Sequence, residues 1–184
     1  MKCVALGVTG SIAAYKAADL VSILVKRGYV VEVVLTRDGA RFITALTLRT
    51  LSKRRVHADM FDESYPVEVE HVSLAKRADL FLVAPASADS IARLALGLAD
   101  DMLGAVALAL EPGRPALVAP AMNTNMYFSA PVQANLAALR SRGWEVIEPR
   151  EARLACGDLG KGAMAEVESI ADRVAGILGE SAER

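Results

Sequence analysis

The sequence predicts an α/β protein, with a doubly wound, Rossmann-like parallel sheet covered by helices on both faces, in three layers and a single domain. Short runs of apolar and β-branched residues alternate along the chain with longer Ala-rich segments of helical periodicity. Of the 184 residues, 53% are hydrophobic but only 5% are aromatic. Ala, Val and Leu therefore dominate, which is typical of helices packed on a buried sheet.

The first elements are a strand, a turn and a helix. Residues 4–8 form a continuous apolar run, and the small polar residues 9–11 predict a tight turn that leads into a helix ending near Gly28. A second strand follows at residues 29–35. Residues 37–70 are less periodic and contain several charges and a proline, which predicts short helices and loops.

Three further strands and four helices complete the pattern. The strands are expected at residues 79–84, 116–119 and 144–147, and the helices at residues 87–96, 101–110, 131–142 and 166–178. Because strands that alternate with helices form right-handed crossovers, all five strands should run parallel in one sheet. We expect residues 1–178 to form the domain and residues 179–184 a flexible tail.

Charge and composition exclude several classes of protein. The 21 Lys and Arg residues against 22 Asp and Glu leave a formal net charge of −1, which argues against general nucleic-acid binding. The chain has no 18-residue apolar run and no signal-peptide pattern, so it should be cytoplasmic and lack a membrane segment. Cys3 opens the first strand and Cys156 follows the last, which should place them at opposite sheet edges as free thiols.

The carboxyl ends of the strands are the expected binding site, because doubly wound folds bind ligands there. The loop with Gly10 and Ser11 opens a helix directly after the first strand, so its N–H groups could hold a phosphate. A glycine turn with Ser11 as helix cap explains the loop equally well, and it matches neither a Walker A loop nor the Gly-x-Gly-x-x-Gly fingerprint. Thr36, after the second strand, could contact a phosphate or ribityl chain, or cap a helix.

Later loops reach the same edge. The small residues 87–90 would let a flat ring approach the backbone, with an ordinary helix cap as the alternative. The loop with Asn123 contains two Asn and two Met, which could clamp a carboxylate and line an apolar wall, or form a turn with Asn caps. His71 could be a general base, although a lone histidine is more often a surface residue. His57 is assigned no role.

The segment from Arg153 to Met164 contains three glycines within six positions beside Cys156. This composition predicts a mobile flap. A cysteine in such a loop, rather than inside an element, favours a reactive thiol over a structural one.

Five segments carry a resemblance to a known family: GSIAAYK, HVSLAKRADLFLVAPASADSIA, ADDML, VAPAMNTNMY and RLACGDLGKGAMAE. In order and spacing they resemble the homo-oligomeric flavin-containing cysteine decarboxylases, over nearly the whole chain. The combination of the PAMN loop with the ACGD flap is highly specific. The resemblance implies an FMN enzyme of coenzyme A biosynthesis that converts 4'-phospho-N-pantothenoyl-L-cysteine to 4'-phosphopantetheine and carbon dioxide.

The resemblance also implies roles for individual residues. The catalytic histidine falls on His71, the carboxylate-binding asparagine on Asn123 and the late proton donor on Cys156. The implied FMN-binding positions are Gly10, Ser11, Ile12, Thr36, Ser87, Ala88, Asp89, Ser90 and Ala121, and the implied substrate-binding positions are Asn123, Arg153, Ala155 and Met164. In the family, FMN first oxidises the cysteinyl thiol, which creates the electron acceptor that decarboxylation requires.

The family's FMN lies at a subunit interface of a trimer, and four trimers often form a dodecamer, so a homotrimer or homododecamer is expected. A separate phosphopantothenoylcysteine synthetase is a candidate partner, because no synthetase domain follows. No metal site is expected. The chain departs from the family pattern at Asp89, where Asn is usual, and at Tyr127, where Trp is usual, whereas Ala163 agrees with the plant-like form of the flap.

Two other functions remain open. A peptidyl-cysteine decarboxylase of the lantibiotic type stops at the enethiol and does not need the reductive cysteine, so the intact ACGD segment argues against it. Non-catalytic regulatory flavoproteins of this fold usually carry long acidic or Ser-rich extensions, which this chain lacks. Flavin prenyltransferases share the fold without the pairing of His71 and the PAMN loop.

Overall fold

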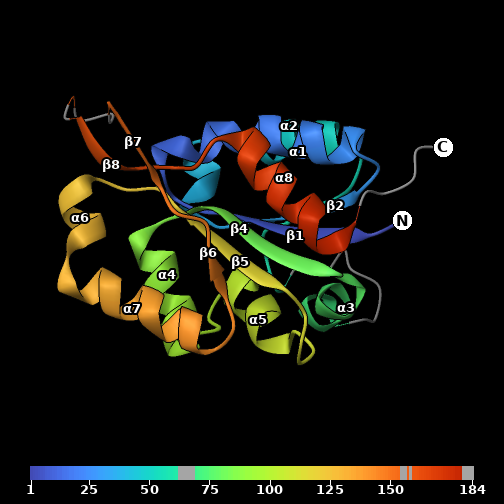
Figure 1. Ribbon diagram of the computed structural model, residues 1–184. Helices are drawn as coiled ribbons and strands as arrows, with labels where there is room; N and C mark the ends of the chain where they lie inside the picture. The colour runs from blue at the N-terminus through green and yellow to red at the C-terminus, as the bar shows by residue number, and fades with distance from the viewer. Residues whose placement is uncertain (62–68, 154–156, 158, 180–184) are drawn as a thin grey trace.

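A six-stranded parallel sheet forms the middle layer of the structure, a computed structural model that describes residues 1–61, 69–153, 157 and 159–179 (Figure 1). In spatial order, the strands are β3 (Val56–His57), β2 (Val30–Leu35), β1 (Cys3–Val8), β4 (Leu80–Ala86), β5 (Ala116–Pro120) and β6 (Glu145–Val146). Each neighbouring pair is parallel. The chain reverses its direction of progress across the sheet between β1 and β4, which is the switch point where doubly wound folds bind ligands. The predicted fold class is confirmed.

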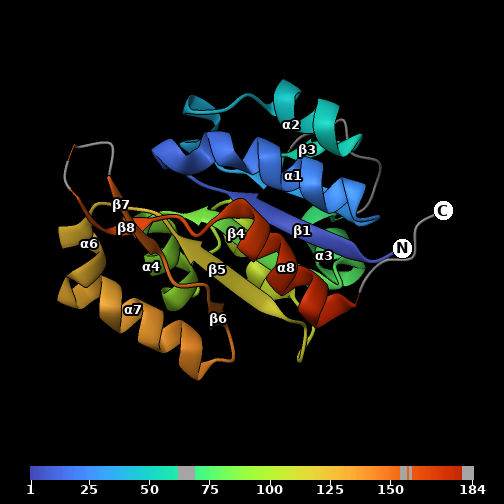
Figure 2. The ribbon, with the colours of Figure 1, turned by 45° about the horizontal axis from the view of Figure 1, so that its top comes forward.

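Helices cover both faces of the sheet (Figures 1 and 2). One face carries α1 (Lys16–Lys26), α2 (Ala45–Ser52) and α8 (Val167–Leu178). The other carries α3 (Glu70–Arg77), α4 (Ala88–Leu96), α5 (Met102–Ala109) and α7 (Ala130–Ser141). Three short elements, the 3-10 turns η1 (Ile12–Tyr15) and η2 (Gly39–Arg41) and the helix α6 (Thr124–Phe128), follow strands or loops at the carboxyl edge.

The two apolar cores follow from side-chain alternation along the strands. Val4, Leu6 and Val8 of β1 pack against α1 and α8, whereas Ala5 packs toward α3 and α5. Every residue of β1 and of β4 is buried. A strand covered on both faces must be apolar throughout, which explains why these strands are continuous apolar runs in the sequence.

A separate antiparallel hairpin joins β7 (Arg150–Arg153) to β8 (Leu159–Ala163). It projects beyond the carboxyl ends of the parallel strands, on the side of α6, and the N-terminus lies at the opposite end of the sheet (Figures 1 and 2). The described part of the predicted flap is therefore a β-hairpin.

Several details differ from the expectations. The edge strand β3 lies within the region expected to be loops and short helices. His71 lies in α3, the helix that directly precedes β4. Cys3 does not lie at a sheet edge, because β1 is an interior strand and order along the chain is not order in space. Cys3 is a buried free thiol, and Cys156 lies outside the described residues.

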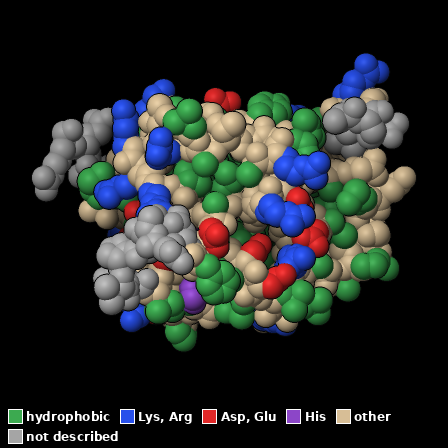
Figure 3. All heavy atoms as spheres, turned by 180° about the vertical axis from the view of Figure 1, so that it is seen from behind, with side chains coloured by type: hydrophobic (Ala, Val, Ile, Leu, Met, Phe, Trp, Pro, Cys, Tyr) green, Lys and Arg blue, Asp and Glu red, His purple; other side chains and the backbone are tan. Residues whose placement is uncertain are grey.

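The surface carries both signs of charge. On the face seen in Figure 3, basic and acidic side chains are interspersed, as the near-zero net charge leads one to expect. Within the part of the chain that the structure describes, no helix is both long enough and apolar enough to cross a bilayer.

Candidate active site

A cavity of about 550 Å³ opens at the carboxyl edge of the sheet. This volume lies within the range of roughly 300 to 1,000 Å³ that is usual for small-molecule sites. The loops after β1, β4 and β5, the start of α1 and the β7–β8 hairpin form its walls. The described lining residues are Gly10, Ser11, Ile12, Ala13, Tyr15, Lys16, Phe42, Ser87, Ala88, Ala121, Met122, Asn123, Met126, Arg150, Ala152, Arg153, Gly162, Ala163 and Met164.

The loop after β1 is held by its own serine. Ser11 caps η1, because its Oγ accepts a hydrogen bond from the Ala13 N–H at 3.3 Å. The same hydroxyl donates to the Ala121 carbonyl oxygen at 3.2 Å, which joins the loops after β1 and β5. A Cβ on Gly10 would lie 2.7 Å from the Cβ of Asp38, so packing alone requires glycine at this position.

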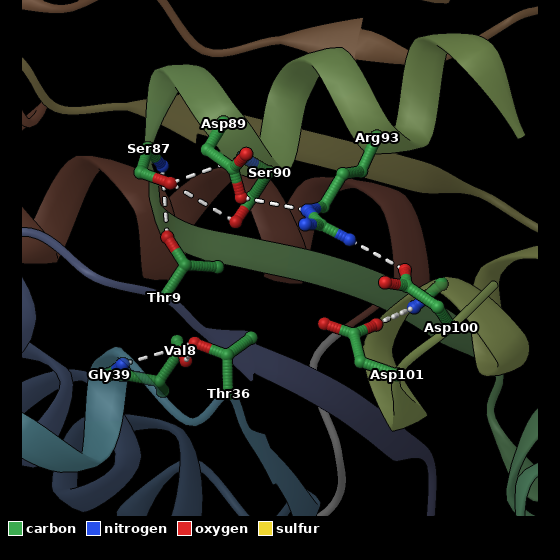
Figure 4. Close-up of polar contacts among 11 residues, drawn as sticks. Val8, Thr9, Thr36, Gly39, Ser87, Asp89, Ser90, Arg93, Asp100 and Asp101 are labelled. Atoms are coloured by element: carbon green, nitrogen blue, oxygen red, sulfur yellow. Dashed lines mark hydrogen bonds and ion pairs between the residues drawn. The ribbon is translucent and has the colours of Figure 1, made fainter. Parts of the chain in front are cut away.

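Thr9 links the loops after β1 and β4 (Figure 4). Its side chain is fully buried, donates to the Pro85 carbonyl oxygen at 2.7 Å and accepts from the Ser87 N–H at 2.9 Å. Ser87 in turn caps α4 by accepting from the Ser90 N–H at 3.2 Å. Two helical segments, η1 and α4, therefore begin at the cavity with their N–H groups in fixed positions.

Asn123 lies at the start of α6, where its Oδ1 accepts from the Asn125 N–H at 2.8 Å. The preceding residue, Met122, donates its N–H to the Gly162 carbonyl oxygen of β8 at 3.0 Å. A Cβ on Gly162 would overlap the Met122 carbonyl oxygen. The hairpin therefore lies directly on the Asn123 loop, at a separation that only glycine permits.

A polar network around Tyr127 fixes β8 to α6 and α7. The buried Tyr127 hydroxyl donates to Glu148 at 2.8 Å, and Glu148 also pairs with Lys161 at 2.8 Å and with Arg140 at 2.7 Å. The Lys161 ammonium lies 5.5 Å from the centre of the Tyr127 ring. Burial, together with the neighbouring Glu148 carboxylate, raises the pKa of Tyr127 to about 12, so the phenol stays a donor. Tyr127, which stands where the family usually has Trp, thus supplies the hydroxyl group of this network.

The predicted cofactor residues divide into two groups. Those that line the cavity are Gly10, Ser11, Ile12, Ser87, Ala88 and Ala121. Thr36, Asp89 and Ser90 are not among the described lining residues.

Figure 4 shows what these three residues contact instead. Thr36 Oγ1 accepts from the Gly39 N–H at 3.1 Å. Asp89 pairs with Arg93 at 2.9 Å, and Arg93 also pairs with Asp100 at 2.6 Å. The buried Ser90 bonds to Ser87. The Asp89 carboxylate is therefore engaged on the outer face of α4.

Of the predicted catalytic and substrate-binding residues, Asn123, Arg153 and Met164 line the cavity. His71, on α3, is not among the described lining residues. Ala155 and Cys156 lie outside the described residues. Within one chain, the cavity therefore combines Asn123 with the loops that contain the predicted FMN-binding residues. His71 is not among the described residues that line it.

Several lining residues were not singled out from the sequence. Lys16 and Met126 lie inside segments that carry the family resemblance, and this was the available signal. Phe42 and Arg150 lie where the sequence shows no periodic pattern. Lys16, Arg150 and Arg153 are cationic, and no acidic side chain occurs among the described lining residues, so the cavity favours an anionic ligand.

The cavity lies at the switch point of the sheet and has small residues on its wall. Helix starts and three cationic side chains also line it. These features are typical of a doubly wound protein that binds a phosphorylated cofactor or nucleotide. The family model named Flavoprotein matches residues 1–179. The chain belongs to this Flavoprotein family.

Relatives in sequence agree on one pathway. The chain is 48% identical over 173 residues to a "Probable phosphopantothenoylcysteine decarboxylase" of Streptococcus mutans. The match covers 94% of this chain and 97% of that relative. It is 45% identical over 169 residues to the "Coenzyme A biosynthesis bifunctional protein CoaBC" of Haemophilus influenzae. The match covers 92% of this chain but only 42% of that bifunctional protein.

Solved structures agree on the fold. A mutant of PPC decarboxylase complexed with pantothenoylaminoethenethiol matches with a TM-score of 0.86 at 32% identity, covering 96% of this chain and 97% of that one. The FMN-binding protein AtHal3 matches with a TM-score of 0.83 at 31% identity, covering 99% of each chain.

Proposed function

We propose that the chain is an FMN-dependent carboxy-lyase with phosphopantothenoylcysteine decarboxylase activity, which converts 4'-phospho-N-pantothenoyl-L-cysteine to 4'-phosphopantetheine in coenzyme A biosynthesis. The observation that carries this proposal is the position of Asn123, between the cofactor-type loops of the cavity and the β7–β8 hairpin that lies on it. The similarity to the Streptococcus relative over almost all of both chains supports the same activity.

The residues of the cavity fit FMN. Gly10, Ala88 and Ala121 leave room for a planar ring at the wall, and the starts of η1 and α4 offer N–H groups to a phosphate. When bound, FMN would supply the two-electron acceptor and donor that decarboxylation of a cysteine requires without an external oxidant. Lys16 adds a positive charge beside the loop of Gly10.

Asn123 is proposed to bind the carboxylate of the substrate. Asn123 lines the cavity, and a side-chain amide has N–H donors that can bind a carboxylate. A neutral donor orients the carboxylate without the strong ion pair that would oppose its loss as carbon dioxide. Arg153 of the hairpin strand β7 is placed to attract the anionic substrate, whereas Arg150 is paired with Glu166 at 2.9 Å.

His71 is proposed to act as the base from a neighbouring subunit, since it is not among the described lining residues of its own chain. The rim of the cavity supports this arrangement: Ile12, Tyr15, Phe42 and Met126 are each 48% to 58% exposed in the single chain. Such an apolar rim is typical of a surface that a second subunit covers. We therefore propose a homotrimer or homododecamer whose sites lie between subunits.

The first experiment tests cofactor and activity. The purified protein should be yellow, carry FMN and release carbon dioxide from phosphopantothenoylcysteine. His71→Asn should abolish release while FMN stays bound, because the base contacts substrate. Asn123→Asp should also be inactive, because a second carboxylate would repel that of the substrate. A colourless protein that takes up no flavin would refute the proposal.

A mixing experiment tests whether sites are shared between subunits. His71→Asn and Asn123→Asp chains, unfolded together and reassembled at equal amounts, should regain about a quarter of wild-type activity, because that fraction of interfaces pairs an intact His71 with an intact Asn123. Each variant reassembled alone is the control. No recovery from correctly assembled mixtures would place both residues in sites formed by one chain.

Cys156 is proposed to donate the proton that completes reduction of the enethiol. Cys156→Ser should then release one equivalent of carbon dioxide and stop at a product two hydrogens short of phosphopantetheine, which mass spectrometry would detect. Repeated turnover by this variant would assign the proton to another group. If the unmutated protein itself stops at the enethiol, that result favours the peptidyl-cysteine decarboxylase alternative.

The cellular setting follows from the same activity. We propose that the protein works in the cytoplasm and that a phosphopantothenoylcysteine synthetase supplies its substrate, because the CoaBC relatives are bifunctional proteins of coenzyme A biosynthesis. We also propose that residues 1–178 form the catalytic domain, which agrees with the end of α8 at Leu178. Loss of carbon dioxide release on truncation after residue 178 would contradict that boundary.

A further inference from the structure

A buried cluster of charged side chains lies outside the cavity, beside His71. His57 of β3 is only 2% exposed. Its Nε2 lies 3.0 Å from Oε2 of Glu32 on β2, and its Nδ1 lies 3.1 Å from Oε1 of Glu70 on α3. One imidazole therefore bridges the edge of the sheet to the first turn of a helix.

The contacts constrain the protons of this cluster. An ionised carboxylate only accepts hydrogen bonds, so a His57 ring that bonds to both carboxylates donates from both of its nitrogens. The cluster must then hold one proton more than a neutral imidazole and two carboxylates. A neutral ring would turn a lone pair toward one carboxylate, which is costly in a buried site.

Charged groups surround the His57 ring. Burial alone would raise the pKa of Glu32, but the hydrogen bond and charge of His57, together with Arg77 and Arg54, lower it. Arg77 of α3 also lies 3.4 Å from Glu70. Glu32 and Glu70 therefore lie on either side of the His57 ring, with Arg77 beside Glu70.

The cluster contacts the start of α3. Glu70 is the first residue of α3, and Val69 before it makes no side-chain cap. Leu74 and Ala75 anchor the later turns in the core. The contact of Glu70 with His57 therefore holds the first turn, and His71 is the next residue.

We propose that His57 is a positioning residue of the decarboxylase: protonated between Glu32 and Glu70, it fixes the first turn of α3 and so the position of the His71 imidazole. This inference rests on the proposed role of His71 as base. His57 does not touch the substrate. It acts through Glu70 and the helix backbone.

The test compares His57→Gln with His71→Asn in carbon dioxide release by the FMN-loaded oligomer. A glutamine cannot donate to both carboxylates in the imidazolium geometry, so kcat should fall at least tenfold while KM, flavin content and oligomer size stay the same. Glu70→Gln should lower kcat in the same direction, and the double variant should be no worse than His57→Gln alone, because both changes break one link. Glu145→Gln, which breaks an exposed ion pair with Arg173, is the matched control and should leave kcat within twofold.

A spectroscopic test uses the unmutated protein, so it remains decisive if His57→Gln fails to fold. The chain has only two histidines, and subtracting the spectrum of His71→Asn from that of the wild type separates them. Solid-state NMR of ¹⁵N-histidine-labelled enzyme should show both ring nitrogens of His57 protonated at the assay pH. A neutral His57, or full activity of His57→Gln when His71→Asn is inactive, would overturn the positioning role alone. An active His71→Asn would instead overturn the proposed base.

Discussion

Thr9→Val removes one hydroxyl from a fully buried position and keeps the size and branching of the side chain. In the structure this hydroxyl donates to the Pro85 carbonyl oxygen at 2.7 Å and accepts from the Ser87 N–H at 2.9 Å. The substitution therefore leaves a buried acceptor and a backbone donor without their partner. Thr9→Ser is the matched control, because it keeps the hydroxyl and removes only a methyl group.

The expected losses differ clearly. Leaving a buried polar group unsatisfied costs about 1 to 3 kcal/mol, so two such groups, one of them at the half-buried Ser87, should lower the free energy of unfolding by about 2 to 4 kcal/mol. Loss of one buried methyl group in Thr9→Ser should cost about 1 kcal/mol. Because Ser87 starts α4 at the cavity, Thr9→Val should also weaken FMN binding more than Thr9→Ser does.

Urea unfolding followed by the fluorescence of Trp144, the only tryptophan, measures both losses. All variants must be compared at one protomer concentration and without added flavin, since assembly and ligand binding shift apparent stability. FMN binding is then titrated by absorbance. If Thr9→Val and Thr9→Ser agree within about 0.5 kcal/mol, the hydroxyl does not hold the two loops together and this reasoning is wrong.

Asp79 and Gly162 give two further predictions. Burial alone would raise the pKa of Asp79, but the Cys3 N–H bond at 2.8 Å and Lys2 outweigh it and lower the pKa. A lowered carboxyl pKa adds stability that is present above the unfolded value of about 3.9 and is lost as the pH falls through the folded value. Asp79→Asn should thus lower the free energy of unfolding by about 1 kcal/mol at neutral pH, and its urea midpoint should converge with that of the wild type in acid. A difference between the two midpoints that widens in acid would contradict a lowered pKa of Asp79. Gly162→Ala should lower kcat/KM at least tenfold without shifting the unfolding midpoint, because the added Cβ would overlap the Met122 carbonyl oxygen outside the main sheet. The control is Gly176→Ala in α8, an exposed position where the nearest atom to the added Cβ is 4.0 Å away, and it should leave activity unchanged. Equal activity of both variants would show that the hairpin has room to move.

The fold could be predicted from the sequence where burial leaves a simple pattern. Strands β1, β4 and β5 are covered on both faces, so they are apolar runs that the sequence displays directly. β3 is only two residues long and ends in a buried histidine, so no periodicity could identify it. Spatial order was also out of reach for Cys3, because position along the chain does not say which strands lie inside the sheet.

The candidate site shows the same division. Gly10, Ser11 and Asn123 follow strands directly, so strand positions and the family resemblance located them. His57 was assigned no role, because its partners Glu32 and Glu70 are distant in the sequence. The pairing of β2 with β3 brings Glu32 to the ring, and the start of α3 brings Glu70. Interactions between distant segments depend on register, which composition does not specify.

The β7–β8 hairpin has a consequence for engineering. Its described residues make no strand pairing with the six-stranded sheet, and they contact the rest of the chain through the Asn123 loop, the Tyr127 network and an ion pair between Arg150 and Glu166. The part of the protein that should select the substrate is thus separate from the part that carries most of the folding energy. Libraries that vary the cavity-facing positions of this hairpin, such as Ala152, and keep Gly162 and Lys161 could alter substrate choice without a matching loss of stability.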